Sequence, residues 1–168
     1  MNPHIRPERP ADTPTIAEVT RLAFTYNGGI RENEMIGEIH ASGRFLPDLS
    51  LVAEVEGQVV GHVIVAPTEL RGDPEHPERP RRVLLLGPLS VLPDFQRRGI
   101  GSALIRSVLA RLGGRPEPMV VLWGHEDYYP RFGFRRAGEF GLRPDTPAAM
   151  VYPLRSDLSS YAGLEMPA

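Results

Sequence analysis

The residues best suited to chemistry lie in the turn Gln96–Ser102, which reads Gln-Arg-Arg-Gly-Ile-Gly-Ser between an apolar run and a helical pattern. The start of a helix offers unpaired backbone N–H groups and a partial positive charge, worth roughly 0.3–1 kcal/mol per favourable anionic contact. Gly99 and Gly101 lack the Cβ atom that would keep a phosphate away from the backbone. Arg97 and Arg98 add permanent positive charge. The turn therefore predicts a phosphate site.

An ordinary strand-to-helix connection accounts for a Gly-x-Gly turn about equally well. Two other phosphate motifs are excluded by single residues. A dinucleotide-binding Gly-x-Gly-x-x-Gly would need glycine where Leu104 stands, and a P-loop would need Gly-Lys-Ser/Thr. The chain has no lysine, because all 19 of its basic residues are arginine. A phosphate contact must therefore come from arginine, backbone or hydroxyl groups.

The apolar run before the turn, Arg82–Leu92, reads as a strand that is interrupted at Gly87-Pro88. Proline has no N–H for a ladder and is confined to edges and bulges. We therefore expect this strand to diverge from its neighbour and to leave backbone groups of residues 89–91 without partners. Buried backbone groups need partners, and an extended ligand that contains amides could supply them.

Two blocks carry a family resemblance. Residues 89–104, Leu-Ser-Val-Leu-Pro-Asp-Phe-Gln-Arg-Arg-Gly-Ile-Gly-Ser-Ala-Leu, resemble the acyl-CoA signature Gln/Arg-x-x-Gly-x-Gly/Ala of the GCN5-related N-acetyltransferases (GNAT). Residues 128–134, Tyr-Tyr-Pro-Arg-Phe-Gly-Phe, are similar to the Tyr-x-x-x-Gly-Phe that follows the fifth strand in that family. The order and spacing of the blocks leave room for one helix and one strand. The resemblance covers nearly the whole chain and extends to the bacterial YhbS-type N-acetyltransferases.

This resemblance implies an α/β (α+β) fold with a mixed, mostly antiparallel sheet of about seven strands, about four flanking helices, and splayed strands 4 and 5. It implies acetyl-CoA as the cosubstrate. The backbone of strand 4 would hold the pantetheine amides and the acyl carbonyl, and the turn would hold the pyrophosphate. The expected cofactor-binding residues are Leu89, Ser90, Val91, Gln96, Arg97, Arg98, Gly99, Ile100, Gly101 and Ser102.

Tyr129 occupies the tyrosine position of the family and is the expected catalytic residue. The resemblance implies that an amine of a small molecule or a peptide attacks the thioester directly in a ternary complex, with the Tyr129 hydroxyl stabilising the departing thiolate. Without the resemblance, Tyr129 reads as a core aromatic. His125, Glu126 or a water chain are candidates for the general base, although a solvated turn also explains both side chains.

Three carboxylates, Glu32, Glu34 and Glu38, fall where the family builds its acceptor side. They could attract a cationic amine, but a charged helix face is the simpler interpretation. An alternative function is a non-catalytic acyl-CoA-binding sensor or structural module. A further alternative is a nucleotide-binding protein of unrelated fold, which would make the second block a coincidence.

Composition limits the class of protein. The 168 residues are 41% hydrophobic and 24% charged, as expected for one globular domain spanning residues 1–168. A net charge of −2 argues against nucleic acid or an anionic membrane as the main partner. The absence of cysteine and the scattered histidines predict no metal site. No signal peptide is recognisable, so we expect a cytoplasmic protein. Late strands could pair between subunits, which makes a homodimer possible.

Periodicity places these residues on elements. The pattern predicts helices over Thr13 to Asn27, Glu34–Ser42 and Gly99–Leu112, and strands over Leu51–Glu56, Gln58–Ala66, Met119–Trp123, Phe134–Ala137 and Ala148–Leu154. Thr68–Arg81 reads as a surface loop, Asp127 as the cap of a helical turn, and Trp123 as a core residue. Residues 155–168 lack a clear pattern, which leaves two alternatives open: a packed segment or a loosely packed tail.

Overall fold

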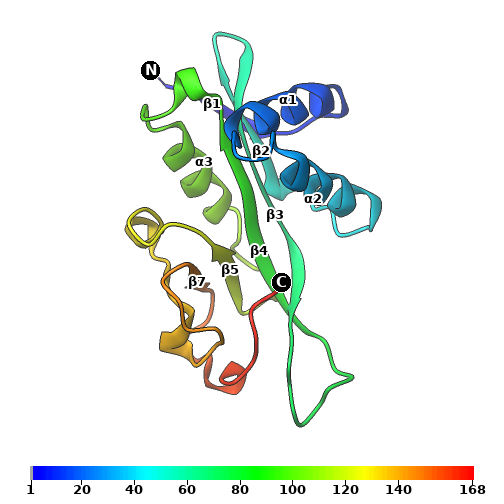
Figure 1. The fold of residues 1–168 in the computed structure, drawn as a ribbon, viewed down its shortest axis with the longest axis vertical. Helices are drawn as coiled ribbons and strands as arrows, with labels where there is room; N and C mark the ends of the chain where they lie inside the picture. The colour runs from blue at the N-terminus through cyan, green and yellow to red at the C-terminus, as the bar shows by residue number, and fades with distance from the viewer. Residues whose placement is uncertain (1) are drawn as a thin grey trace. The chain divides into compact units, whose positions relative to one another are not determined.

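The computed structural model describes residues 2–168, and this part of the chain contains seven strands and three α-helices joined by loops and short 3₁₀ turns (Figure 1). The strands are β1 (His4–Pro7), β2 (Ser50–Val55), β3 (Gln58–Leu70), β4 (Arg81–Val91), β5 (Met119–Trp123), β6 (Arg135–Arg136) and β7 (Ala149–Pro153). The α-helices are α1 (Thr13–Ala23), α2 (Ile30–Ala41) and α3 (Ile100–Leu109). The sheet has the order β1-β2-β3-β4-β5-β7-β6.

The sheet is mixed, as predicted. β4 and β5 run parallel, whereas β1 with β2, β2 with β3, β5 with β7, and β6 with β7 are antiparallel. The β4–β5 register pairs Leu84 with Val120 and Leu85 with Val121, and β4 then continues to Val91 beyond that pairing. This confirms the splayed strands. About four helices were expected, but the fourth is a short 3₁₀ turn, Tyr129–Phe132, with a proline at its second position.

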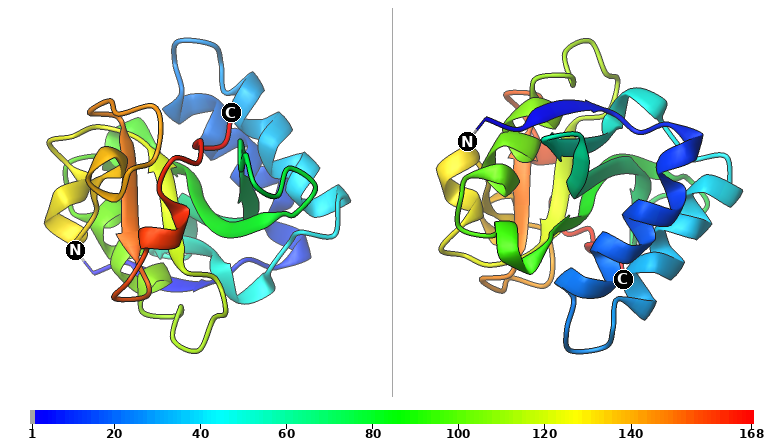
Figure 2. Two further views of the ribbon diagram at one scale, coloured as in Figure 1. Left: turned by 90° about the horizontal axis from the view of Figure 1, so that it is seen from below. Right: turned by 90° about the horizontal axis from the view of Figure 1, so that it is seen from above.

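The chain divides into two compact units, and the first contains residues up to Ala66 together with Gly87–Gly113. Within it, α1 and α2 lie side by side and pack on one face of β2 and β3 (Figure 2). The buried residues of this cluster are Ile16, Ile36, Ile39, Val52, Val59, Ile64 and Ala66. The helix α3 buries its own apolar side, Ile100, Leu104, Ile105 and Val108, at 1% exposure or less. Each such side chain stabilises the fold by about 1.5–3 kcal/mol.

The second unit contains Pro67–Leu86 and Gly114–Ala168, and its core lies around the antiparallel pair β5 and β7 (Figure 2). Of the two alternatives for residues 155–168, the structure has the packed one, because Leu158, Leu164 and Met166 are buried in this core. The backbone of Glu165 also exchanges two hydrogen bonds with that of Arg71, at 3.0 and 2.8 Å. These irregular contacts have no periodicity that a pattern could reveal.

Several element boundaries differ from the predicted ones. Strand β1 was not predicted, since four residues before a proline-rich segment carry no alternation. The helix α2 begins at Ile30 rather than Glu34, after Gly29 in the left-handed conformation with φ of 69°. Strand β3 extends to Leu70, into the expected loop. No helix within residues 2–168 is both long and apolar enough to cross a membrane.

Candidate active site

The turn between β4 and α3 is shaped by backbone and side-chain hydrogen bonds. The Leu92 N–H donates to the Val60 carbonyl at 2.8 Å, and the Gln96 Nε2 atom donates to the Val91 carbonyl at 3.0 Å. Arg97 and Gly99 then adopt left-handed conformations, with φ of 63° and 82°. The chain therefore reverses direction within a few residues and enters α3 at Ile100.

The start of α3 is open toward the turn. The first helical hydrogen bond joins the Ala103 N–H to the Gly99 carbonyl at 3.0 Å, so the N–H groups of Ile100 and Gly101 lie ahead of it. A β-carbon at Gly99 would meet no atom within 4 Å, so the space above this backbone is clear. The left-handed φ belongs to Gly99, whereas Gly101 lies within the first turn of the helix.

The arginines of the turn are accessible to solvent. Both Arg97 and Arg98 are exposed, and the Arg98 guanidinium lies 5.5 Å from the centre of the Phe95 ring. Their charges add to the partial positive charge at the start of α3. The predicted residues 96–102 therefore come together as one cationic, backbone-lined turn that has the chemistry of a phosphate site.

The end of β4 separates the three predicted strand residues by face. Leu89 and Val91 are half-buried on one side, whereas Ser90 is 2% exposed and points to the other. The buried Ser90 Oγ atom has no hydrogen-bond partner within residues 2–168. The Val91 carbonyl, which was expected to be open, accepts the Gln96 side chain. Of the groups expected to lack partners, the Val91 carbonyl is thus paired within the protein.

Tyr129 is held by the turn that follows β5. The Tyr129 N–H donates to the His125 carbonyl at 3.4 Å, and Gly133 ends the turn with a φ of 103°. The ring of Phe134, 2% exposed, meets the Tyr129 ring edge-to-face at 5.8 Å. In the second block, Gly133 thus permits the left-handed conformation that ends the turn, and Phe134 packs against the Tyr129 ring.

Burial sets the proton state of Tyr129. Desolvation of the half-buried phenol raises its pKa to about 12, and the nearby Tyr128 adds to this shift. The ring of Tyr128 packs edge-on against that of Tyr129 at 5.1 Å. Tyr129 therefore stays a neutral hydrogen-bond donor throughout the physiological pH range.

Sequence reasoning missed Arg131, which stiffens this turn. Its Nε atom donates to the Tyr128 carbonyl at 3.0 Å, and its guanidinium lies 4.8 Å from the centre of the Tyr128 ring. Asp127 was expected to cap the turn, but the capping position is Tyr128 and no side chain caps it. The spacing of arginine three residues after an aromatic was the available signal.

The remaining predicted residues are dispersed. His125 and Glu126 are exposed on the turn after β5. Trp123, expected in the core, is 43% exposed, and its indole N–H donates to the Pro167 carbonyl at 3.0 Å. The prediction of a core position was wrong because Trp123 is the last residue of β5 and lies at the edge of the packed region.

The three acidic residues of α2 do not share one face. Glu32 is 8% exposed and accepts a hydrogen bond from the Tyr26 hydroxyl at 2.5 Å. Glu34 and Glu38 are exposed, and Glu38 pairs with Arg44 at 3.2 Å. They therefore form no single carboxylate patch.

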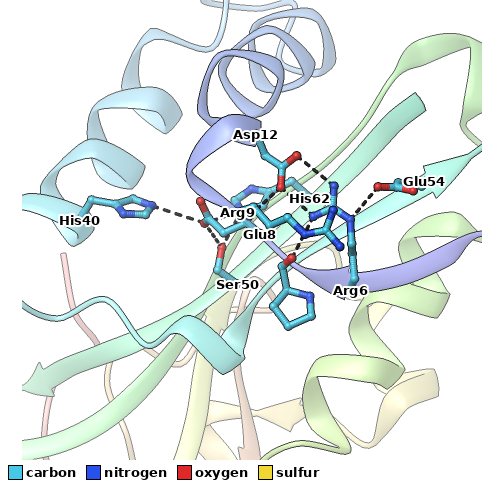
Figure 3. A network of polar contacts seen from close by, with 9 residues as sticks. Arg6, Glu8, Arg9, Asp12, His40, Ser50, Glu54 and His62 are labelled. Atoms are coloured by element: carbon cyan, nitrogen blue, oxygen red, sulfur yellow. Dashed lines mark hydrogen bonds and ion pairs between the residues drawn. The ribbon is translucent and has the colours of Figure 1, made fainter. Parts of the chain in front are cut away.

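A second polar cluster lies inside the first unit, around the Glu8 carboxylate (Figure 3). The Ser50 hydroxyl donates to Glu8 Oε1, and the His62 Nε2 atom lies 2.9 Å from that hydroxyl. The Nε2 atoms of His40 and His62 lie 3.4 and 3.7 Å from Glu8 Oε1. Because the single hydroxyl proton goes to the carboxylate, His62 must donate through Nε2 to the Ser50 oxygen.

This Ser-His-Glu group is not a nucleophilic site. A catalytic carboxylate would bind the other ring nitrogen, but His62 Nδ1 has no partner within residues 2–168. Ser50 and His62 are also 0% exposed, out of reach of a substrate. Beside the cluster, Arg6 binds both oxygens of Asp12, at 2.7 and 3.0 Å. The network therefore ties the first strands to α2 and serves stability.

We expect acid to destabilise the protein partly through Glu8. Burial alone would raise the pKa of Glu8, but the Ser50 hydroxyl that donates to the carboxylate and the nearby His62 and His40 side chains outweigh burial and hold this pKa below its usual value. Its contribution is therefore present above about pH 4.5 and is lost as the pH falls through the lower, folded-state pKa. Glu8→Gln should lower the free energy of unfolding at pH 7 by about 1–3 kcal/mol.

The measurement is thermal unfolding of both chains from pH 7 to pH 3, with the exposed Glu38→Gln as the matched control. The Tm of the wild-type chain should fall more steeply below pH 5 than that of Glu8→Gln. Parallel curves for these two proteins would contradict the assignment. Asp12, whose pKa is also lowered, by Arg6, contributes equally to all three chains.

A pocket of about 620 Å³ opens in the second unit, between the loop after β3 and residues 160–164. Two of its arginines are already paired. Arg81 binds Asp73 at 2.9 Å and lies 4.4 Å from the centre of the Tyr161 ring, while Arg82 binds Glu117 at 3.0 Å. The charges that line this pocket are largely compensated within the protein.

Comparison with known proteins identifies the family. The model of the acetyltransferase (GNAT) domain matches residues 47–136, which include both sequence blocks. The uncharacterised N-acetyltransferase YjhQ of Escherichia coli K12 is 33% identical over 138 residues, covering 82% of this chain and 72% of that protein. The chain belongs to the GNAT acetyltransferase family. The uncharacterised N-acetyltransferase YhbS of the same strain is 31% identical over 166 residues, covering 95% and 93% of the two proteins.

Solved structures agree with this GNAT assignment. A GNAT family acetyltransferase from Brucella melitensis, in complex with acetyl-CoA, has a TM-score of 0.74 and 36% identity, covering 93% of this chain and 90% of that one. YhbS from Escherichia coli, in complex with CoA, has a TM-score of 0.79 and 28% identity, covering 99% and 91%. The family and fold that the two sequence blocks predicted are confirmed.

Proposed function

We propose that this GNAT protein is an N-acetyltransferase that moves the acetyl group of acetyl-CoA to an amine of a small molecule or a peptide. The observation that carries the proposal is the open, cationic turn at the start of α3, where Gly99 leaves clear space before the N–H groups that precede the first helical hydrogen bond. Two structural relatives that match nearly the whole chain are complexes with acetyl-CoA and with CoA.

The residues of the turn fit a pyrophosphate. The N–H groups of Ile100 and Gly101 precede the first helical hydrogen bond, and an anion at this point benefits from the helix dipole. Exposed Arg97 and Arg98 offset further negative charge. We assign the pantetheine amides and the acyl carbonyl to the backbone of Leu89 and Val91, which share the half-buried side of β4.

The reaction requires a neutral amine that attacks the thioester carbonyl in a ternary complex. The new C–N bond forms, the C–S bond breaks, the amine gives its proton to water, and the sulfur leaves as a thiolate. A cysteine nucleophile is excluded because the chain has none. We assign the backbone N–H of β4 to the oxyanion and the Tyr129 hydroxyl to the departing sulfur.

A hydrogen bond from Tyr129 is favoured over full proton transfer. The pKa of Tyr129 is raised to about 12, whereas an ordinary thiol has a pKa of about 8.5. Transfer of the phenol proton to the thiolate would therefore be uphill by about 5 kcal/mol. A charge-assisted hydrogen bond stabilises the thiolate without that cost.

We expect acetyl-CoA and CoA to stabilise the protein, and ATP and NAD to do so far less. A ligand at 100 times its Kd adds about 2.7 kcal/mol to the free energy of unfolding. For a chain of this size, that raises the Tm by roughly 5–10 °C. Thermal unfolding with each ligand is the measurement, and an equal shift with ATP would show a general phosphate site instead of a CoA site.

The acceptor can be found by following acetyl-CoA consumption against a panel of amines that includes polyamines, aminoglycosides and peptide N-termini. Turnover with any of these is expected from an enzyme. CoA binding without turnover on the entire panel would favour the alternative of an acyl-CoA sensor.

A further inference from the structure

Gly124 directly follows β5, and its backbone conformation does not require glycine, because its φ lies outside the left-handed region. The reason for glycine at this position is the lack of room for a side chain. A β-carbon at Gly124 would lie 2.3 Å from Cε2 and 2.8 Å from Cδ2 of the Tyr129 ring, far inside contact distance. The tyrosine ring therefore occupies the volume that a side chain at position 124 would fill.

The backbone of Gly124 is held more firmly in this contact than the ring of Tyr129. The Gly124 N–H donates to the Ala148 carbonyl at 2.9 Å, which holds the backbone beside β7. The Tyr129 ring is bounded on other sides by Phe134 and Tyr128, whose ring centres lie 5.8 and 5.1 Å away. A methyl group at position 124 would therefore displace the ring of Tyr129 more readily than the strand.

We propose that Gly124 is a positioning residue, whose missing side chain sets how closely the Tyr129 ring packs on the end of β5 and hence where the phenol hydroxyl lies. This inference rests on the proposed role of Tyr129 in the reaction. Relieving a 2.3 Å contact requires the ring to move by about 1 Å. Misplacement of a catalytic group by about 1 Å can cost on the order of 100-fold in rate.

The test is a double-mutant cycle of Gly124→Ala and Tyr129→Phe, with kcat and the Kd for acetyl-CoA measured for each chain. We expect Gly124→Ala to lower kcat by about 10- to 100-fold, no more than Tyr129→Phe does, and to leave the Kd unchanged. In the Tyr129→Phe background, Gly124→Ala should change kcat less than about twofold, because the hydroxyl that it displaces is gone. Gly113→Ala is the matched control, since a β-carbon there meets no atom within 4 Å.

The outcomes separate this inference from the proposed function. Wild-type turnover of Tyr129→Phe would remove the proposed role of the tyrosine. If Tyr129→Phe lowers kcat but Gly124→Ala keeps the wild-type kcat, only the positioning role of Gly124 is overturned. An equal loss from Gly124→Ala in both backgrounds, or a weaker Kd, would overturn it as well, since either marks a general structural effect.

If Gly124→Ala is too unstable for kinetic measurements, its melting temperature still tests the inference. If the methyl group collides with the ring, the smaller side chain of Tyr129→Leu should make room for it. The Tm loss caused by Gly124→Ala should then shrink in the Tyr129→Leu background. An undiminished loss there would show that the glycine accommodates something other than this ring, which overturns the inference.

Discussion

Replacing Tyr129 with phenylalanine is expected to lower kcat by about 10- to 150-fold while acetyl-CoA binding stays nearly intact. The substitution keeps the ring, and with it the edge-to-face contact with Phe134 at 5.8 Å. Only the hydroxyl is lost. A charge-assisted hydrogen bond is worth roughly 1.5–3 kcal/mol, which converts to that range of rates. The loss falls on kcat because the thiolate that the hydroxyl stabilises develops in the transition state.

The measurement is kcat from pH 6 to pH 10, together with the Kd for acetyl-CoA, once an acceptor is known. Because burial raises the pKa of Tyr129 to about 12, its deprotonation should not produce a basic limb in this range. The pH profile should therefore keep its shape in Tyr129→Phe and shift downward as a whole. Wild-type turnover would return Tyr129 to the role of a packed aromatic, and a matching loss of acetyl-CoA affinity would make it a cofactor contact.

Replacing Gly101 with valine is expected to weaken CoA binding by at least tenfold, or about 1.4 kcal/mol, in a chain that stays folded. Gly101 lies in the first turn of α3, where its N–H precedes the first helical hydrogen bond. A branched side chain there would stand where we assign the pyrophosphate. The fold should tolerate it, because Gly101 has no left-handed φ and valine is a better helix former than glycine.

Calorimetric titration with CoA measures this effect, and Gly37→Val in α2 is the matched control. Gly37 is also a helical glycine, and a β-carbon there would meet no atom within 4 Å. The control should bind CoA like the wild-type chain. Unchanged affinity in a folded Gly101→Val protein would show that the start of α3 does not hold phosphate.

Local signals explain why the fold could be predicted. The glycine-rich turn, the apolar face of α3 and the run Met119–Trp123 each lie within one continuous segment, so their periodicity and their breaks are visible in the residues themselves. The interruption at Gly87-Pro88 predicted that β4 would leave its neighbour, and within residues 2–168 the pairing of β4 with β5 runs through Leu84 and Leu85 and ends before this interruption. Features of this kind depend on residues that are close in sequence.

The misplaced features depend on partners distant in sequence. Leu158, Leu164 and Met166 of the tail are buried against a core built around β5 and β7, and the backbone of Glu165 bonds to that of Arg71. The buried contact between Ser50 and His62 joins two strands, and no local pattern marks either residue as part of a polar network. These contacts depend on which distant segments pack together in the folded chain. Hydrophobic periodicity does not show which segments will meet.

The family, the mixed sheet and the two blocks on which the proposed function rests could all be predicted from the sequence, because each depends on contiguous residues. Tertiary structure alone decided how those blocks are supported. It paired the Val91 carbonyl with the Gln96 side chain and placed the ring of Tyr129 against Gly124. Space and hydrogen-bond partners are properties of the packed chain, so a glycine that matters for its missing side chain becomes visible only after folding brings its neighbour against it.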